Sequence, residues 1–196
     1  MKDLQHLLKF IELTHQFQNI ERTVYAGVGN DRFENDAEHS YQVAITAWYL
    51  NSTRNLHFEN EKLFKYALAH DLVEAYAGDT SIHDKEAHAV KHEREEKALE
   101  QIVQTFPECT DMYETIKAYE RREDGESKFV YALDKLLPML NAYLDSGRSW
   151  HKNRASYTAI HEYKLPKVAL DPTIHDLYNE LTKLLEQRKE LFFSQS

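Results

Sequence analysis

The pair His70-Asp71 lies inside an apolar stretch that reads Ala-Leu-Ala-His-Asp-Leu-Val-Glu, from Ala67 to Glu74. Burying an imidazole beside a carboxylate costs free energy unless a cation compensates both groups. An imidazole nitrogen and a carboxylate oxygen together suit a divalent ion such as zinc, manganese, iron or cobalt. The pair therefore predicts two ligands of a metal site.

Two further side chains can complete such a site. His39 stands near the start of a predicted helix, a position where side chains converge on a site. Asp134 is a single carboxylate surrounded by leucines in a second apolar helical run. The predicted ligands of one divalent ion are His39, His70, Asp71 and Asp134.

Two nitrogens and two oxygens leave positions on the ion open for water and a substrate oxygen, which is typical of catalytic sites. Hydrolysis of a phosphate ester is then the expected reaction, because a bound divalent ion activates water and polarises a phosphoryl oxygen. Glu74, on the same helix face as the His-Asp pair, is the expected catalytic carboxylate. Arg22 offers a planar cation that matches phosphate, although a surface salt bridge explains it equally well from spacing alone.

Helical periodicity dominates the chain, beginning with Leu4, Leu7, Leu8 and Ile11 on one face of an amphipathic helix. Further helices are expected at about 36–53, 60–76, 86–105, 110–123, 126–146 and 171–192. Residues 21–34 are expected to form a loop, and alternation typical of strands is nearly absent. The sequence therefore predicts an all-α, single-domain helical bundle.

Several residues predict where these helices begin and end. Asn35 and Glu38 have the spacing of a capping box before the helix that carries His39. Asp171-Pro172 is a start signal for the last helix, and Gly78 is expected to end the third helix.

Composition narrows the function classes. The 196 residues fit one domain spanning 1–196, and there is no Gly-rich or Pro-rich linker. A net charge of −9 with dispersed basic residues argues against polymeric nucleic acid as a partner. No apolar run approaches the roughly 20 residues that span a bilayer, so no membrane partner is expected. A single cysteine, Cys109, and a start without an apolar signal core favour a cytoplasmic location.

The order of these residues resembles the HD-domain metal-dependent phosphohydrolases, and within them the 5'-deoxynucleotidases. The resemblance covers roughly residues 20–145 and depends on Arg22, Glu38-His39, His70-Asp71-x-x-Glu74, Gly78-Asp79 and Asp134. It implies that the four predicted ligands hold one divalent cation, such as cobalt or manganese. It also implies that Arg22 holds the substrate phosphate, that Glu74 is required for activity and that Asp79 contacts the sugar hydroxyl.

The resemblance further implies a homodimer that removes the 5'-phosphate from deoxynucleoside monophosphates. Bacterial members of the branch carry Trp after the matching Arg, whereas Thr23 stands here. Selectivity between deoxyribose and ribose therefore stays open.

Alternatives remain at this point. The four predicted ligands could be satisfied core hydrogen-bonding groups, or part of a metal-bound nucleotide-sensing module without activity. Another HD-type hydrolase acting on a different phosphate ester or diester is a third alternative. Ala75 after Glu74 and the lack of a Gly-Tyr-Pro element argue against the alarmone hydrolases and the cyclic-dinucleotide phosphodiesterases, respectively. His88 and His92 have metal-ligand spacing but charged neighbours, which favours a solvated helix face.

Overall fold

Amphipathic helices make up most of the chain, as its periodicity predicts. The structure, a computed structural model, describes residues 2–78 and 90–194. Its helices are α1 (Lys2–Gln18), α2 (Asp36–Arg54), α3 (Asn60–Ala69), α4 (Glu74–Ala77), α6 (Lys91–Thr105), α7 (Thr110–Arg121), α8 (Gly125–Leu144), α9 (Arg148–Lys152), α10 (Tyr157–Val168), α11 (Pro172–Glu186) and the 3-10 turn η1 (Lys189–Leu191). The strands β1 (Glu21–Tyr25) and β2 (Phe33–Asn35) form a small antiparallel sheet. The all-α fold class is confirmed.

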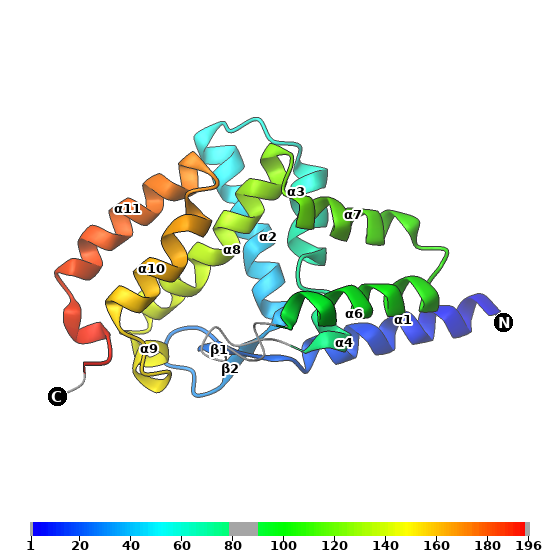
Figure 1. Cartoon of the computed structure of the whole chain (residues 1–196), viewed down its shortest axis with the longest axis horizontal. Coiled ribbons are helices and arrows are strands. Elements are labelled where there is room, and N and C mark those ends of the chain that lie inside the picture. The colour runs from blue at the N-terminus through cyan, green and yellow to red at the C-terminus, as the bar shows by residue number, and fades with distance from the viewer. Residues whose placement is uncertain (1, 79–89, 195–196) are drawn as a thin grey trace.

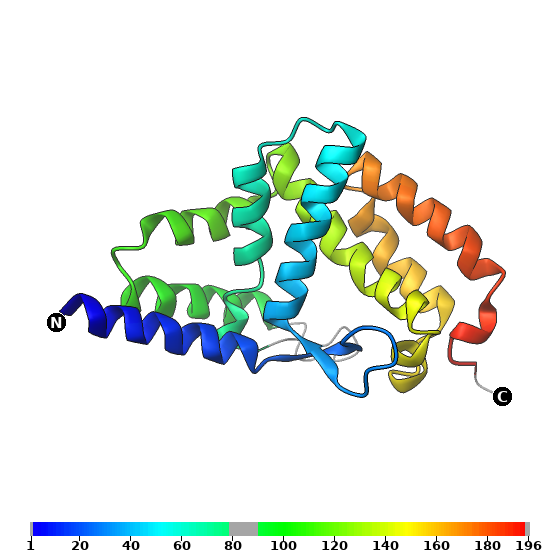
Figure 2. The ribbon, with the colours of Figure 1, turned by 180° about the vertical axis from the view of Figure 1, so that it is seen from behind.

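Two groups of buried apolar side chains hold the helices together. The larger core surrounds α8, whose Leu133 and Leu136 are fully buried against α2, α3, α10 and α11. The smaller core joins α1, α6 and α7 through Leu13, Ile102 and Ile116. Figure 1 shows α2 and α8 crossing the middle of the molecule, with α10 and α11 on one side and α1, α6 and α7 on the other. Figure 2 shows the same arrangement from behind, with the two termini at opposite ends.

The predicted helix starts and stops are present. The Asn35 side chain accepts from the Glu38 backbone N–H, and the Glu38 side chain accepts from the Asn35 N–H, which completes the capping box of α2. Asp171 caps α11, with Pro172 as its first residue. Gly78 ends α4 at a φ of 73°, a conformation that favours glycine.

The helix expected at 60–76 is interrupted, so this part of the prediction is wrong. α3 ends at Ala69, and hydrogen bonds to the residue three positions earlier follow, such as Leu72 N–H to Ala69 O at 3.2 Å and Glu74 N–H to Asp71 O at 2.8 Å. A tightened turn keeps nearly the same apolar pattern as an α-helix, so periodicity does not reveal it. His70 and Asp71 therefore lie on this turn and not in a regular helix.

The sequence prediction also differs from the structure at two other places. Residues 21–25 form β1 where a loop was expected. The alternation of apolar and polar residues along so short a strand is too brief to be recognised in the sequence. α9 and α10 lie in a region for which no helix was predicted, and α10 has a weak apolar stripe because Lys164 occupies one of its core-facing positions. None of the described helices combines the length and apolarity that crossing a bilayer requires.

Candidate active site

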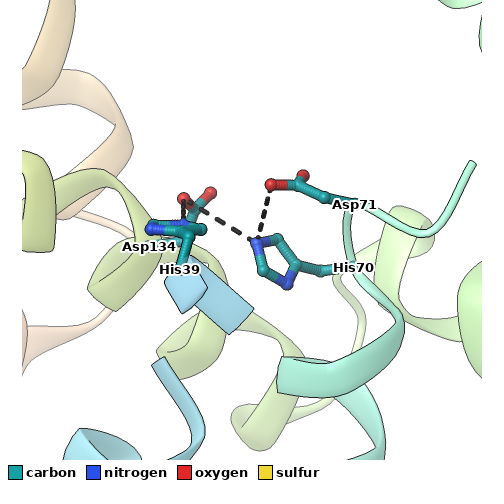
Figure 3. A group of neighbouring side chains, drawn as sticks. All are labelled: His39, His70, Asp71 and Asp134. Atoms are coloured by element: carbon teal, nitrogen blue, oxygen red, sulfur yellow. Dashed lines mark hydrogen bonds and ion pairs between the residues drawn. The ribbon is translucent and has the colours of Figure 1, made fainter. Parts of the chain in front are cut away.

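Three separate elements bring the four predicted ligands together, as Figure 3 shows. His39 comes from the first turns of α2, Asp134 from the middle of α8, and His70 and Asp71 from the turn after α3. One ligand atom of each side chain lies within 4.8 Å of the others. That turn lies where the two cores meet, since Ala67 belongs to the larger core and Leu72 to the smaller one.

The hydrogen bonding of His70 prepares it to bind a cation. Its Nδ1 lies 2.9 Å from the Ala67 carbonyl oxygen, which can only accept, so Nδ1 carries the hydrogen. Nε2 then faces Asp71 Oδ2 at 3.0 Å and Asp134 Oδ1 at 4.0 Å. A second hydrogen bond that fixes the ring orientation is typical of histidines that bind metals.

The charges around His70 favour a cation at this position. Burial lowers the pKa of His70, but the carboxylates of Asp71 and Asp134 outweigh burial and raise it overall. Burial likewise raises the pKa of Asp71, but His70 and Arg22 hold it far below its ordinary range. The two carboxylates therefore favour a positive charge at His70 Nε2, which a proton or a divalent ion can supply.

His39 and Asp134 face each other in the fully enclosed part of the site. His39 Nε2 lies 3.0 Å from Asp134 Oδ1, and His39 Nδ1 lies 3.4 Å from Glu34 Oε1. Within the described residues, His39 Nδ1, His70 Nε2 and Asp134 Oδ2 are buried without a hydrogen-bond partner of good geometry. Two nitrogen and two oxygen donors with such unsatisfied atoms fit a divalent transition-metal ion.

Lys135 adds a positive charge on the other side of Asp134. Its Nζ lies 2.6 Å from Asp134 Oδ2. Burial raises the pKa of Asp134, but Lys135 and the two histidines outweigh it and lower the pKa well below the ordinary value. The carboxylate is therefore ionised and available as a ligand.

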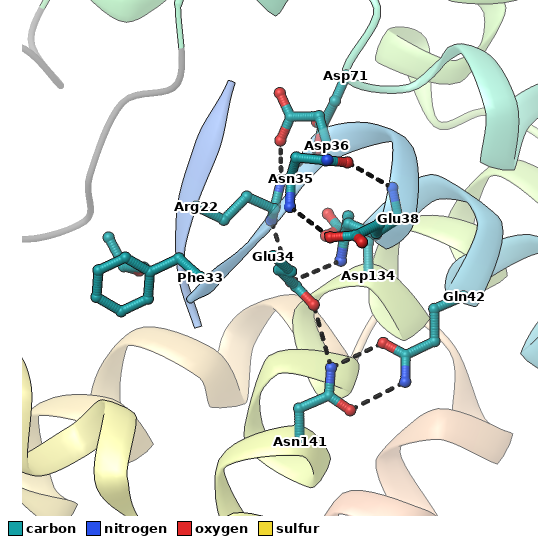
Figure 4. Close-up of polar contacts among 12 residues, drawn as sticks. Arg22, Phe33, Glu34, Asn35, Asp36, Glu38, Gln42, Asp71, Asp134 and Asn141 are labelled. Atoms are coloured by element: carbon teal, nitrogen blue, oxygen red, sulfur yellow. Dashed lines mark hydrogen bonds and ion pairs between the residues drawn. The ribbon is translucent and has the colours of Figure 1, made fainter. Parts of the chain in front are cut away.

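Arg22 lies on β1 and contacts three carboxylates, as Figure 4 shows. Its Nη1 donates to Asp36 Oδ1 at 2.9 Å and to Asp71 Oδ2 at 2.8 Å, and its Nε lies 3.4 Å from Glu34 Oε1. Its side chain is only 14% exposed, so it is not a surface arginine. Arg22 thus joins the first turn of α2 to the turn that carries Asp71.

Glu74 is buried at the first residue of α4, next to the predicted ligands. Its Oε1 lies 3.2 Å from Lys91 Nζ on α6. Glu74, Asp36 and Asp71 form a second group whose oxygens lie within 4.8 Å of one another. The carboxylate therefore stands beside the site, with a lysine that holds it in place.

Sequence reasoning missed four charged residues of this site: Glu34, Asp36, Lys91 and Lys135. The two acids flank Asn35, so the attention that the capping box drew to this segment could have included them. Lys135 follows Asp134 directly inside an apolar run, which is the same anomaly that identified Asp134. Lys91 has no such signal, because it stands in a strongly charged helix.

Two other predictions concern residues 79–89. Asp79, the predicted sugar contact, and His88 lie outside the described residues. His92 lies on the exposed side of α6, 3.5 Å from Glu96, as expected of a solvated face.

The family model described as HD domain matches residues 14–172. The chain belongs to the HD-domain family. The matched region contains every predicted metal ligand, and the resemblance to the HD-domain family that the motif order indicated is confirmed.

Relatives of this HD-domain chain carry a more specific description. The 5'-deoxynucleotidase HDDC2 of Bos taurus is 31% identical over 140 residues, which cover 70% of this chain and 67% of that protein. The proteins of the same name from Homo sapiens and Mus musculus are each 33% identical over 138 residues, covering 69% of this chain. These alignments cover 66% and 68% of the two relatives. The chain thus matches about two thirds of their length.

Solved structures agree with the fold. The crystal structure of a protein named as a predicted metal-dependent phosphohydrolase from Magnetospirillum magnetotacticum MS-1 matches with a TM-score of 0.81 and 26% identity, over 97% of this chain and 96% of that chain. An HD-domain phosphohydrolase from Listeria innocua matches with a TM-score of 0.57 at 19% identity, over 92% of this chain and 86% of that one, and shows the fold alone.

Proposed function

We propose that the chain is a metal-dependent phosphomonoesterase that removes the 5'-phosphate from deoxynucleoside monophosphates. The observation that supports this most strongly is the convergence of His39, His70, Asp71 and Asp134 around one position, in a chain of the HD-domain family. The name 5'-deoxynucleotidase of its relatives supports the substrate class.

The chain's own residues have distinct parts in this proposal. A bound divalent ion supplies an activated water and polarises the phosphoryl oxygen. Glu74, beside the ligands, orients the attacking water, which requires a carboxylate within hydrogen-bond reach. Arg22 holds Asp71 in place and contributes positive charge toward the substrate phosphate. Asp79 is proposed to contact the sugar hydroxyl.

The ion is proposed to be cobalt, manganese, zinc or iron. Two imidazoles with two carboxylates form a mixed donor set, which suits these borderline ions better than calcium or magnesium.

A panel of 5'-monophosphates tests the proposal, with deoxyribose and ribose forms of each base and with manganese, cobalt or EDTA. We expect metal-dependent release of phosphate from deoxyribonucleotides, and a loss of at least about 100-fold in kcat for Glu74→Gln. Metal binding by this variant should be unchanged. No phosphate release from any ester, despite bound metal, would instead favour the nucleotide-sensing module.

We also propose that two copies form a homodimer, through apolar side chains that the single chain leaves exposed. On α1 these are Leu4, Leu7, Leu8 and Ile11, at 41–60% exposure, and on α2 they are Tyr41, Ile45, Trp48 and Tyr49, at 42–67% exposure. Both helices lie on the side of the molecule seen in Figure 2. An apolar hollow of about 400 Å³ between α1, α2, α3 and α7 adjoins this surface. Such a large apolar surface marks an interaction site.

The mass in solution tests the homodimer. Wild-type protein should have twice the mass of the chain by light scattering, and Trp48→Glu should shift it toward the monomer. Val28→Glu is the matched control, because Val28 is 71% exposed on the loop between β1 and β2. A monomeric wild-type protein would contradict the homodimer without affecting the proposed activity. A cytoplasmic location is likewise a proposal, supported by the nucleotide substrate class.

A further inference from the structure

A buried lysine next to the site has no part in the function proposed above. Lys164 lies on α10 and is only 8% exposed. It shares the buried face of α10 with Ile160 and Val168, which belong to the larger core around α8. A lysine at such a position costs stability unless an anion compensates its charge.

Lys164 belongs to a group of four lysines around the site. Lys167 follows it by one turn on α10, which packs against α8, the helix that carries Asp134 and Lys135. The fourth member is Lys91 on α6, which pairs with Glu74. Burial and the charges of Lys135, Lys167 and Arg22 together lower the pKa of Lys164 to about 7, although Asp134 opposes them. This environment agrees with the packing of α10 against the helix that carries Asp134.

The four lysines differ in their partners. Lys135 pairs with Asp134 at 2.6 Å, and Lys91 pairs with Glu74 at 3.2 Å. Neither Lys164 nor Lys167 has a carboxylate within ion-pair distance in the part of the chain that the structure describes. Lys167 instead lies over the Tyr163 ring, 3.0 Å from its centroid.

Arg22 alone does not supply the positive charge that a substrate phosphate needs. Its guanidinium already donates to Asp36 and Asp71 and lies beside Glu34, so much of its charge is compensated within the protein. A phosphate monoester carries nearly two negative charges at neutral pH and needs additional positive charge. Lys164 and Lys167 are the cations near the site whose charge no described carboxylate compensates.

We propose that Lys164, assisted by Lys167, binds the phosphate group of the substrate at the metal site, and that this charge is kept for binding at a cost in stability. The inference rests on the proposed phosphomonoesterase function. It identifies Lys164 as a substrate-binding residue that the motif order does not include.

Lys164→Met tests the inference, because methionine retains the length and apolar stem but removes the charge. In the metal-loaded protein, we expect KM for a deoxynucleoside monophosphate to rise about 10- to 100-fold, with a smaller change in kcat. The calorimetric Kd for inorganic phosphate should rise similarly, and the Kd for manganese should stay the same. Lys164→Arg should recover part of the phosphate affinity, and Lys183→Met, at an exposed position of α11, is the matched control.

Thermal stability separates a binding role from a structural one. If Lys164 is kept for phosphate, the Tm of Lys164→Met should equal or exceed that of the wild type, since a buried uncompensated charge is removed. A lower Tm or an unfolded variant would overturn the inference, as would unchanged KM and phosphate Kd.

The two proposals fail in different ways. If the wild-type protein hydrolyses no phosphomonoester, the proposed function is wrong, and phosphate calorimetry still reports on Lys164. If the wild type is active and Lys164→Met matches it in KM and phosphate Kd, only the inference about Lys164 is wrong.

Discussion

At the scale of single residues, the site depends on what compensates the charge of Asp71 and Asp134. The pKa of His70 is raised because these carboxylates outweigh the effect of its burial. A histidine with a raised pKa contributes stability that is fully present below about pH 6.5 and is lost as the pH rises through its raised pKa. The lowered pKa of Asp71 acts in the opposite direction, and its contribution is lost only as the pH falls below about 4.

The opposite pH dependence of His70 and Asp71 predicts how much a bound metal stabilises the protein at each pH. The metal-free protein should lose stability as the pH rises above about 6.5 and through the raised pKa of His70, because the proton on His70 is lost. A divalent ion replaces that proton, so the Tm gained on adding manganese should grow with pH. Thermal unfolding from pH 6 to pH 9, with manganese or with EDTA, measures this gain. A gain that stays constant over the range would contradict the assignment of His70 as a ligand.

Asp134 provides a second prediction at the residue scale. With metal at 100 times its Kd, binding stabilises the wild-type protein by about 2.7 kcal/mol. Asp134→Ala removes one ligand and should weaken metal binding about 100-fold, which reduces this gain to about 0.4 kcal/mol. Asp171→Ala, which removes a buried carboxylate from the start of α11, should retain the full gain. If Asp134→Ala also retains it, Asp134 is not a ligand.

At the scale of elements, the cap of α2 matters more than the other helix caps. Asn35 stops the fraying of the turn that carries Asp36 and His39, and β2 ends directly at Asn35. Asp171 also caps its helix with its side chain, since the Ile174 N–H donates to Asp171 Oδ1 at 3.0 Å, but α11 carries none of the predicted site residues. The two caps therefore form a matched pair.

The helix caps Asn35 and Asp171 predict that two substitutions will lower stability equally but activity unequally. Asn35→Ala and Asp171→Ala should each lower the free energy of unfolding by about 1 kcal/mol. Only Asn35→Ala should also weaken metal binding and hydrolysis, because α2 positions His39. Chemical denaturation and metal-dependent assays measure the two effects, and equal activity losses would show that the cap of α2 does not position the site.

At the scale of the whole molecule, we propose that residues 1–196 form a single domain although they have two cores. Ala67 of α3 belongs to the larger core, and Leu72 and Val73 of the turn that follows belong to the smaller one. The ion pair between Arg22 and Asp71 also connects β1 to this turn. The C-terminal segment is also packed in place, since the Trp150 and Phe192 rings stack 4.4 Å apart.

Single-domain folding predicts one cooperative unfolding transition. Tryptophan fluorescence and far-UV circular dichroism should give the same Tm. Gly147→Ala should lower both Tm values together, because Gly147 has a φ of 74° and an added Cβ would lie 2.8 Å from Leu191 Cα. The strained backbone alone costs about 1–3 kcal/mol. Gly27→Ala, with a similar φ of 77° but open space around it, should cost less. Two separate transitions would contradict a single domain.

The sequence by itself determined the fold class, most helix positions and the four side chains that meet as a possible metal site. Buried ionisable residues such as His70, Asp71 and Asp134 stand out against an apolar helical pattern, and caps such as Asn35 follow from local hydrogen bonding. These are short-range signals, so they can be detected without a fold.

Only the tertiary structure decided which charges compensate one another. Arg22 contacts Asp36 and Asp71, and Lys164 is buried without a described carboxylate within ion-pair distance, because of how β1, α8 and α10 pack. Neither residue has a distinctive spacing along the chain. The strength of the interaction between two charges depends on the distance between them and on their burial. For residues far apart in sequence, both are set only when the helices pack together.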